Sequence, residues 1–509
     1  QRVCDRLRMP LALGRAAEGE AQEVSWREAR DRSGARATRY YATIPGRCAL
    51  DGIELMRSAT YGFENFSLEF VARAVLGRGK LVDDVAQRGA EITTLFAQDK
   101  VALARYNLED CKLVWGIFEK ERLLEFAIEK SMLTGLELDR YGGSVAALDF
   151  LYLPRLHRRG YVAPASGLGE GSNVSPGGYV LDSQPGIFED VLVLDFKSLY
   201  PSIMRTFQVD PLALARAPFE PTPIGGFDGG RFARDGAILP ELIENLWSAR
   251  DRAKAAGDKI MSQAINIIMN SFYGVLGTPS CRFLDARLVS SITKRGHQII
   301  LRSQEFIEAR GYRVIYGDTD SVFVLVPQAE IDRERRPGPD TRDDAVQRLG
   351  QSLATQMTDW WRETTRAEEG VESFLEMEFE THFLKFLMPT IRGTDAGSKK
   401  RYAGMVRDAS AEDGNRLVFK GLESARSDWS PLAREFQREL YGRVFRSQPY
   451  ADFIYDTVAS LRAGELDSKL VFRKRIRRRL DDYVKNVPPH IQAARKAELS
   501  RRERGLTLD

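Results

Sequence analysis

One stretch of the sequence limits the fold more than any other, residues 312–326, YRVIYGDTDSVFVLV. Two short runs of β-branched and aromatic residues, Tyr312 to Tyr316 and Ser321 to Val326, flank the four residues from Gly317 to Asp320. High β-propensity on both sides of a Gly/Asp turn predicts a β-hairpin. We therefore expect two antiparallel strands joined by a turn that carries acidic side chains.

This turn holds two carboxylates, Asp318 and Asp320, between strands apolar enough to be buried. On an extended backbone, side chains two residues apart point to the same side, so both acids would be presented together. Two anions held that close raise each other's pKa unless a cation lies between them. The pattern favours a divalent metal site, although hairpin turns also carry Asp for turn geometry alone.

A third carboxylate is expected from a distant strand. Val191 to Leu194 is an apolar run that leads to Asp195, and the next residues, Phe196 to Ile203, turn from strand into helix. The N–H groups at a helix N-terminus suit a phosphate group. A single Asp at a strand end is more often a cap or turn residue, but its combination with Asp318 and Asp320 favours catalysis.

The chain has 509 residues, which is too long for one core, so about three or four domains are expected. A net charge of +3 says little about partners. No apolar run is long enough to span a membrane, and no signal peptide is visible. The four cysteines form no CxxC pair, which argues against a disulfide framework and fits a reducing cytoplasm. Because the chain begins with Gln1 and has no initiator Met, we expect a fragment.

Residues 1–135 have a mixed α/β pattern. Cys48 to Asp51 follow a turn and predict a short strand that ends on an acid. Tyr106 and Asp110, at the start of a predicted helix, are four residues apart and share one helical face. A Tyr that orients water beside an Asp that binds metal is a hydrolytic pairing, although such pairs also arise by chance.

Residues 140–190 are rich in glycine and predict a connection between domains. Two helices are predicted farther on. The first carries Arg250 and Lys254 one turn apart, and the second spans Gln263 to Gly274. A basic pair on a helix is usually a solvated face. Here it lies between the two acid-bearing strands in sequence, where it would suit a triphosphate.

Beyond the hairpin, the sequence predicts a charged loop from Gln328 to Asp344 and an acidic strand from Leu375 to Glu380. The last part of the chain is helical and basic. A run with this many basic residues is either solvated surface or a contact to a phosphate backbone. It consists of Arg473, Lys474, Arg475, Arg477, Arg478 and Arg479. Together with the KKRY cluster at 399–402, this run favours nucleic acid as the partner.

Three segments in this order resemble the three polymerase motifs of the family B DNA polymerases: DFKSLYPSI (195–203), IIMNSFYGVLG (267–277) and YGDTDS (316–321). KKRY (399–402) and KGLE (420–423) resemble the family's primer-strand and thumb motifs. The flanking sequence is similar to that of bacterial members. The resemblance covers essentially the whole chain, and three ordered motifs are far more specific than any one of them.

The resemblance implies a multidomain α/β and α+β fold, a right hand of palm, fingers and thumb with a partial RNase H-like 3′–5′ exonuclease domain. The implied domains are 1–135 (partial exonuclease), 136–189 (connection), 190–240 (palm), 241–285 (fingers), 286–395 (palm) and 396–509 (truncated thumb). The implied partners are primer-template DNA, dNTPs, two Mg²⁺ ions and a sliding clamp bound through residues outside this chain. No membrane is involved, and the implied place is the cytoplasm, at the nucleoid, in DNA replication or repair.

The resemblance also assigns roles to individual residues. The metal ligands would be Asp195, Asp320 and the carbonyl of Phe196, with Asp318 beside them. Tyr200 would lie under the deoxyribose as a steric gate. The whole nucleotide site would comprise Ser198, Leu199, Tyr200, Arg250, Lys254, Asn266, Asn270, Tyr273 and Gly274. DNA would contact Gly177, Gly178, Lys399, Lys400, Arg401, Tyr402, Lys420, Arg473, Lys474, Arg475 and Arg477.

One departure from the family lies at position 266. Family members carry a Lys four residues before the Asn of NSxYG, where it binds the triphosphate, whereas this chain has Asn266. A neutral amide supplies no positive charge to the transition state, so we expect a rate lower by about 10² to 10³. Lys259, seven residues earlier and about 10 Å away along a helix, would substitute only in part.

The second departure concerns the exonuclease. Only the third of its motifs is present, in Tyr106 and Asp110, and Asp51 resembles an accompanying position. One acid cannot hold two metals, so this chain is not expected to proofread, whereas its intact parent is. The thumb is also expected to be incomplete at Asp509. The alternatives are a non-catalytic DNA-binding subunit weakened by Asn266, and a nuclease module, against which the missing motifs argue.

Overall fold

The computed structural model describes residues 2–15, 23–29, 39–63, 65–81, 88–140, 143–167, 176–391, 393–425, 429–471, 476, 480–484 and 487–504. The chain divides into two compact units, Leu50–Val418 and a smaller one that combines Gln1–Ala49 with Phe419–Asp509. We describe each unit by itself. In the described ranges, no helix is both long and apolar enough to cross a membrane.

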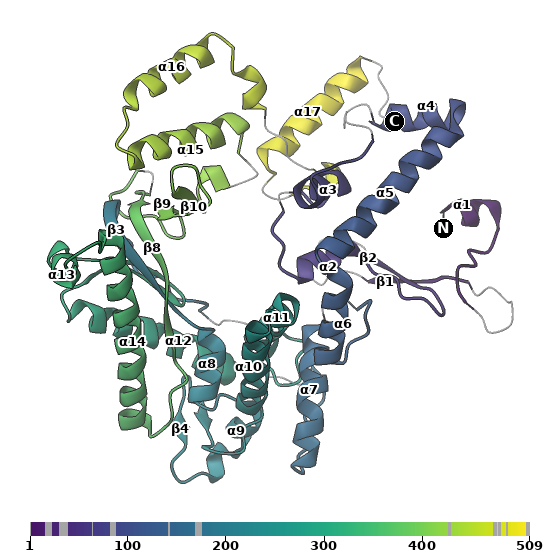
Figure 1. The fold of residues 1–509 in the computed structure, drawn as a ribbon. Helices are drawn as coiled ribbons and strands as arrows, with labels where there is room; N and C mark the ends of the chain where they lie inside the picture. The colour runs from purple at the N-terminus through teal and green to yellow at the C-terminus, as the bar shows by residue number, and fades with distance from the viewer. Residues whose placement is uncertain are drawn as a thin grey trace. The chain divides into compact units, whose positions relative to one another are not determined.

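The larger unit is built on a sheet of six strands in the order β10-β9-β8-β3-β7-β6 (Figure 1). The pairs β3–β7, β3–β8, β6–β7 and β8–β9 are antiparallel. The strands are β3 (Gly186–Phe196), β6 (Arg313–Asp318), β7 (Ser321–Leu325), β8 (Met377–Met388), β9 (Tyr402–Arg407) and β10 (Asn415–Lys420), and a separate small sheet consists of β4 (Ile224–Gly225) and β5 (Arg231–Phe232).

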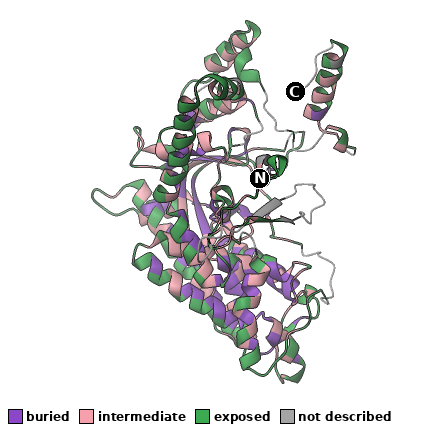
Figure 2. Cartoon of the chain, turned by 90° about the vertical axis from the view of Figure 1, so that its right-hand side faces the viewer, coloured by how far each residue is buried: buried purple, intermediate pink, exposed green. Residues whose placement is uncertain are grey.

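Strand β3 lies inside this sheet because both of its faces are apolar. Leu192 and Leu194 belong to the core formed with the helices, whereas Val191 and Val193 belong to a second core that includes Phe323. A strand covered on both faces is expected to be a continuous apolar run rather than an alternating one. Figure 2 shows the buried residues gathered along the central sheet and the helices packed on it.

Helices α12 and α14 pack on the sheet through β6 and β8. The indole Nε1 of Trp361 on α14 donates a hydrogen bond to Ser303 Oγ on α12 at 3.0 Å, which joins the two helices. The middle and late helices of this unit are α7 (Ser144–Arg158), α8 (Leu199–Thr206), α9 (Pro211–Arg216), η1 (Ala217–Phe219), α10 (Leu239–Ala255), α11 (Lys259–Leu276), α12 (Ala286–Glu308), α13 (Gln328–Glu334) and α14 (Arg342–Glu369).

A separate core lies among the first helices of the larger unit and includes Leu55, Val71, Leu113 and Phe126. These helices are α2 (Gly52–Ser58), α3 (Leu68–Leu76), α4 (Arg88–Gln98), α5 (Lys100–Lys120) and α6 (Leu123–Thr134). The smaller unit contains α1 (Arg2–Leu7), β1 (Ser25–Ala29), β2 (Arg39–Thr43), η2 (Glu423–Ala425), α15 (Pro431–Phe445), α16 (Ala451–Arg462), η3 (Asp467–Leu470), η4 (Leu480–Asp482) and α17 (Pro489–Glu503). The expected mixture of helices and sheets is confirmed.

The hairpin is present, but its turn is shorter than the sequence predicts. β6 ends at Asp318 and β7 begins at Ser321, so the turn is Thr319–Asp320 rather than four residues. Thr319 has φ of +60°, and the N–H of Asp320 donates to the carbonyl of Asp318 at 2.7 Å. The backbone between the two acids is therefore not extended, and the argument that both point to the same side was wrong.

Other expectations also need correction. Asp51 does not end a strand but accepts hydrogen bonds from Ile53 and Glu54 as the N-cap of α2. The predicted loop of residues 328–344 contains α13 and the start of α14, because Thr341 and Asp344 form a capping box. Three element bounds also differ: Tyr106 and Asp110 lie inside α5 rather than at its start, α11 begins at Lys259 rather than at Gln263, and the acidic strand spans Met377–Met388 rather than Leu375 to Glu380.

Candidate active site

A cavity of about 460 Å³ in the larger unit lies where six segments meet: the end of β3, the start of α8, helices α10 and α11, the hairpin turn and the start of β8. It brings together eleven of the residues assigned from the resemblance: Asp195, Phe196, Ser198, Leu199, Tyr200, Arg250, Lys254, Asn266, Asn270, Tyr273 and Asp320. Its other lining residues, to which we had assigned no role, are Lys197, Pro201, Thr319 and Glu378.

Strand register brings Asp195 and Asp320 side by side. Asp195 is the register partner of Ser321, and the N–H of Phe196 donates to the carbonyl of Asp320 at 2.9 Å. The pKa of Asp195 is raised to about 8, mainly by burial and in addition by the negative charges of Asp320 and Glu380. Burial also raises the pKa of Asp320 to about 6, and the charge of Asp318 adds to this effect. These two acids are therefore held in a negative, partly desolvated place.

Asp318 takes a different position from the other two acids. It does not line the cavity; instead Lys400 Nζ lies 3.2 Å from its carboxylate, and Thr319 Oγ1 donates to it at 3.0 Å. Among the described residues, no group of three or more His, Cys, Asp and Glu side chains is arranged to hold a metal ion. A cation shared by Asp195 and Asp320 would need at least one more donor, such as a carbonyl, a water or a rotated Asp318.

Glu378 and Glu380 are acids that our interpretation of the sequence missed. Glu378 on β8 is the register partner of Asp195, and both glutamates raise the pKa of Asp195. Lys197 lies on the same rim, 3.3 Å from the carboxylate of Glu376. The signal was present in the sequence: acids at 376, 378 and 380 alternate with Met377 and Phe379, and alternate residues of a strand share one face.

The opposite wall of the cavity is cationic and amphipathic. Arg250 on α10 donates through Nη1 to Ser198 Oγ at 3.4 Å, and its buried Nε has no hydrogen-bond partner among the described residues. Lys254 follows one turn later. Asn270 Nδ2 donates to Asn266 Oδ1 at 3.4 Å. Lys259 and Gly274 do not line the cavity, so the structure gives no support to a partial replacement of the missing lysine by Lys259.

Two aromatic rings close the same wall. The rings of Tyr200 and Tyr273 lie 4.6 Å apart between centroids, at an interplanar angle of 49°. Burial raises the pKa of Tyr200 above its ordinary value, so the hydroxyl stays protonated at neutral pH. A pair of rigid rings beside two acids and two cations forms a pocket suited to a flat ligand that carries phosphate.

The segments assigned to DNA contact the hairpin. The N–H of Thr319 donates to the carbonyl of Tyr179 at 2.8 Å, directly after Gly177 and Gly178, and a Cβ added to Gly178 would lie 2.2 Å from Thr319 Oγ1. The N–H of Lys400 donates to Tyr316 OH at 3.0 Å. The remaining predicted contacts are Lys399, Arg401 and Tyr402 in or next to β9, the exposed Lys420 at the end of β10, and Arg473, Lys474, Arg475 and Arg477, which lie outside the described residues.

Tyr106 and Asp110 lie on one face of α5, as predicted, but they share a cation from the chain itself. Lys80 Nζ donates to Asp110 Oδ2 at 2.6 Å and to Tyr106 OH at 3.3 Å. In the part of the chain that the structure describes, Asp110 Oδ1 is buried and has no hydrogen-bond partner. Unlike Asp195, Asp110 therefore has its charge balanced within the chain.

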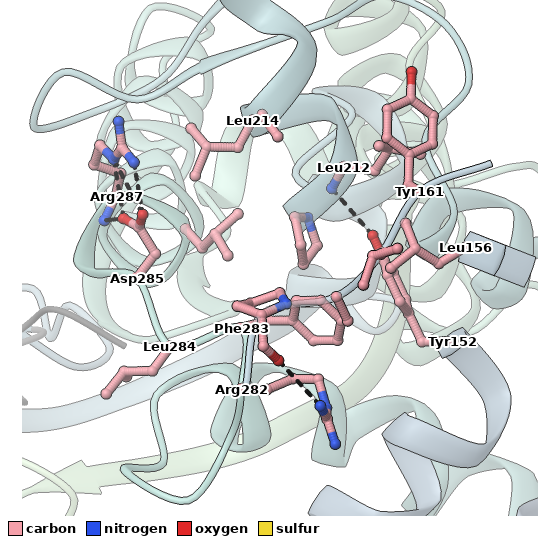
Figure 3. A pocket seen from close by; sticks show the side chains of 16 residues that line it. Tyr152, Leu156, Tyr161, Leu212, Leu214, Arg282, Phe283, Leu284, Asp285 and Arg287 are labelled. Atoms are coloured by element: carbon pink, nitrogen blue, oxygen red, sulfur yellow. Dashed lines mark hydrogen bonds and ion pairs between the residues drawn. The ribbon is translucent and has the colours of Figure 1, made fainter. Parts of the chain in front are cut away.

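A second cavity of the larger unit, about 390 Å³, carries none of the assigned residues (Figure 3). Phe283, Leu212 and Leu214 contribute to its apolar walls. Its charged members are already paired: the side chain of Arg282 forms two hydrogen bonds to Asp149, and that of Arg287 forms three to Asp285. This apolar hollow offers no uncompensated charge.

Comparison with known proteins identifies the family. The sequence matches DNA polymerase family B over residues 141–222 and 230–507. It is 50% identical to the DNA polymerase II of Escherichia coli (strain K12), over 100% of this chain and 62% of that protein. It is 26% identical to a DNA polymerase of Thermococcus gorgonarius, over 90% of this chain and 57% of that protein. Against the DNA polymerase delta catalytic subunit of Bos taurus the identity is 27%, over 89% and 41%.

The chain spans less than two thirds of the length of these relatives. The expected similarity to bacterial members is confirmed by the first of them. With a family match over most of its length, this chain belongs to DNA polymerase family B.

Proposed function

We propose that this chain carries out template-directed DNA synthesis, in which the 3′-hydroxyl of a primer attacks the α-phosphate of a dNTP and pyrophosphate leaves. One observation carries the proposal. Two half-buried carboxylates, Asp195 and Asp320, line one cavity with the cations Arg250 and Lys254. Acids that attract metal and cations that attract a triphosphate are the two halves of a nucleotidyl-transfer site.

The residues present fit a divalent cation. Asp195 and Asp320 would hold it with the carbonyl of Phe196, because both carboxylates line the same cavity and a cation there would offset the burial and the neighbouring acids that raise their pKa values. Two Mg²⁺ ions bound there would supply a lowered pKa for the primer hydroxyl and neutralisation of the phosphates. Asp318 would join once its side chain leaves Lys400.

The protein's own groups would orient the nucleotide. Arg250 and Lys254 would bind the triphosphate oxygens, and the buried Nε of Arg250 is a donor still to be satisfied. The N–H groups of Ser198 and Leu199 at the start of α8 would add hydrogen bonds to phosphate. Tyr200 would exclude a 2′-hydroxyl, and Asn270, Tyr273 and Gly274 would border the nascent base pair.

The remaining roles follow the family architecture. We propose palm segments at 190–240 and 286–395, fingers at 241–285 and a thumb from 396, with Gly177, Gly178 and residues 399–402 against primer-template DNA. A sliding clamp would bind outside this chain. Similarity to a bacterial polymerase suggests work in the cytoplasm, at the nucleoid. Proofreading would need carboxylates in addition to Asp110, so it is not part of the activity proposed for this chain.

Primer extension tests the proposal. Wild-type chain, a primer-template with a 5′ overhang, Mg²⁺ and the four dNTPs should give elongated primer. Asp320→Ala should abolish elongation, whereas the conservative Lys259→Arg, which lies outside the cavity, should retain it. Duplex binding without extension by the wild type would instead indicate a non-catalytic DNA-binding subunit.

A further inference from the structure

Asp318 differs from the other two acids assigned to metal, because its carboxylate already forms an ion pair with a lysine. Lys400 Nζ lies 3.2 Å from its carboxylate, and two hydroxyls, Thr319 Oγ1 and Tyr316 OH, donate to it at 3.0 Å and 3.4 Å. Its neighbours Asp195 and Asp320 have no such cation among the described contacts of the cavity. Of the three acids assigned to metal, Asp318 is thus paired with Lys400 instead of lining the cavity with Asp195 and Asp320.

The backbone around Asp318 is fixed, so any movement belongs to its side chain. Val180 forms a β-bridge with Asp318, the N–H of Thr319 donates to Tyr179 at 2.8 Å, and the N–H of Leu181 donates to Gly317 at 2.9 Å. Strand β6 and the turn after it are therefore hydrogen-bonded to residues 179–181 on one side, and β6 is paired with β7 on the other. A change of rotamer about the Asp318 side chain requires none of these bonds to break.

Lys400 likewise combines a fixed backbone with an exposed side chain that is able to move. Its N–H donates to Tyr316 OH at 3.0 Å and its φ is +61°, while its side chain is 62% exposed. Ion pairs exposed to this extent stabilise little, because water and salt screen them. An anion with more charge than one carboxylate, such as a phosphate backbone, would therefore displace Asp318 readily.

We propose that Lys400 is a positioning residue that holds Asp318 away from Asp195 and Asp320 until the phosphate backbone of primer-template DNA takes its ammonium group. The released Asp318 completes the set of carboxylates, so the site gains its full affinity for divalent metal only when DNA is bound. This inference rests on the proposed function and adds an order of events to it: DNA first, a complete metal site second. A chain without DNA is thereby kept from loading metal fully.

Metal binding, measured without turnover, tests the idea. Free Mn²⁺ is followed by electron paramagnetic resonance during titration of wild type, Lys400→Met and Lys399→Met. Lys399 is the matched control because it carries the same charge next door but contacts the Val180 carbonyl and Asp182 instead. Without DNA, Lys400→Met should bind Mn²⁺ about tenfold more tightly than wild type, the lower end of the effect of groups that hold a ligand. Lys399→Met should change little.

Two further arms make the result specific. Adding a dideoxy-terminated primer-template should raise the Mn²⁺ affinity of wild type but not that of Lys400→Met. The gain from Lys400→Met should vanish in the double variant with Asp318→Asn, because the released carboxylate is then absent. Lys400→Gln, which keeps a polar side chain, replaces Lys400→Met should the latter fail to fold.

An affinity of Lys400→Met within twofold of wild type, an equal gain in Lys399→Met, or a gain that persists without the Asp318 carboxylate would each overturn the proposal. Its failure is separable from failure of the proposed function. A wild type that extends primers while Lys400→Met leaves Mn²⁺ binding unchanged retains the polymerase assignment alone. A wild type that extends no primer removes that assignment, whatever the Mn²⁺ titration gives.

Discussion

Strand β3 carries two aspartates, Asp190 and Asp195, in opposite surroundings. Asp190 is 4% exposed and accepts hydrogen bonds from Arg342 Nε at 2.8 Å and His382 Nε2 at 2.9 Å. Burial disfavours its charge, but the hydrogen bonds from His382 and Arg342 outweigh burial and lower its pKa. Asp195, five residues on, has Asp320 and two glutamates for neighbours, and its pKa is raised to about 8.

The difference separates an acid that serves the fold from one that serves chemistry. A buried carboxylate with its own cations joins β3 to β8 and α14 and needs nothing from solvent. A half-buried carboxylate surrounded by acids has its charge disfavoured in the free protein, and a positive ligand would remove that penalty. The apolar cavity of Figure 3, in which Arg282 and Arg287 are both paired, follows the first pattern.

The largest effect should come from Asp195→Asn. Loss of a metal-holding carboxylate removes several kcal/mol of transition-state stabilisation, so primer extension should fall by at least about 10³-fold. Asp190→Asn should retain the wild-type rate per folded molecule, because Asp190 does not line the cavity. Single-nucleotide incorporation at saturating dNTP measures both. An equal loss of incorporation rate in the two variants would contradict the distinction between a structural Asp190 and a catalytic Asp195.

Asn266→Lys should change the rate in the other direction. It adds a cation to the wall that holds Arg250 and Lys254, and a preorganised contact of this kind contributes about 10² to 10³ in rate. The measurement is the rate of the first incorporation after rapid mixing. Asn266→Gln is the matched control without charge and should match wild type. No gain with Lys would show that position 266 does not meet the triphosphate.

Stability should respond to the two acids in the reverse order. Asp190→Asn keeps a side chain that tolerates the φ of +51° at this position but leaves Arg342 and His382 without their carboxylate. Removing one partner of a buried charge pair costs about 3 kcal/mol. Asp195→Asn should leave the free energy of unfolding equal or higher. Urea unfolding with EDTA present measures both, and a strongly destabilised Asp195→Asn would contradict the account.

The smallest effect is a dependence on pH with opposite signs. An unfolded Asp has a pKa of about 3.9. Because the pKa of Asp190 is lowered, its stabilising contribution is complete above about pH 4 and is lost as the pH falls through the lowered value. Because the pKa of Asp195 is raised to about 8, its contribution is complete below about pH 4 and is lost as the pH rises through 8.

Unfolding curves between pH 4 and 8 in EDTA should therefore show a decline in stability that Asp195→Asn reduces and Asp190→Asn does not. Mg²⁺ should oppose the decline in wild type, since it binds the ionised carboxylates. A decline of the same size in wild type and Asp195→Asn would show that groups other than Asp195 cause the loss of stability.

The cavity was predicted from two sources: local patterns gave the strand before Asp195, the hairpin and the pair Arg250 and Lys254, whereas the family resemblance gave most of the other lining residues. The apolar run before Asp195 fixed a buried strand, and the helical spacing of Arg250 and Lys254 placed both on one face. The hairpin followed from two β-rich runs around Gly317–Asp320. These features depend on neighbours in sequence, and sequence reasoning handles neighbours well.

The features that could not be predicted from the sequence depend on contacts between residues that are far apart in the chain. The short turn depends on Thr319 at positive φ, which its pairing with Tyr179, 140 positions earlier, supports. Nothing in the local pattern shows that Lys400 lies on Asp318 or that Lys80 lies on Asp110. Glu378 was visible as an alternating acid but acquired meaning only from its register opposite Asp195.

The central claim is that Asp195 and Asp320 share a divalent cation, and the most direct measurement is anomalous diffraction from crystals with Mn²⁺, primer-template and an unreactive dNTP analogue. The account predicts a peak about 2.0–2.3 Å from a carboxylate oxygen of each of these two residues, in the range of oxygen-ligated divalent ions. No peak between them, or a peak at the already neutralised Asp190, would contradict it.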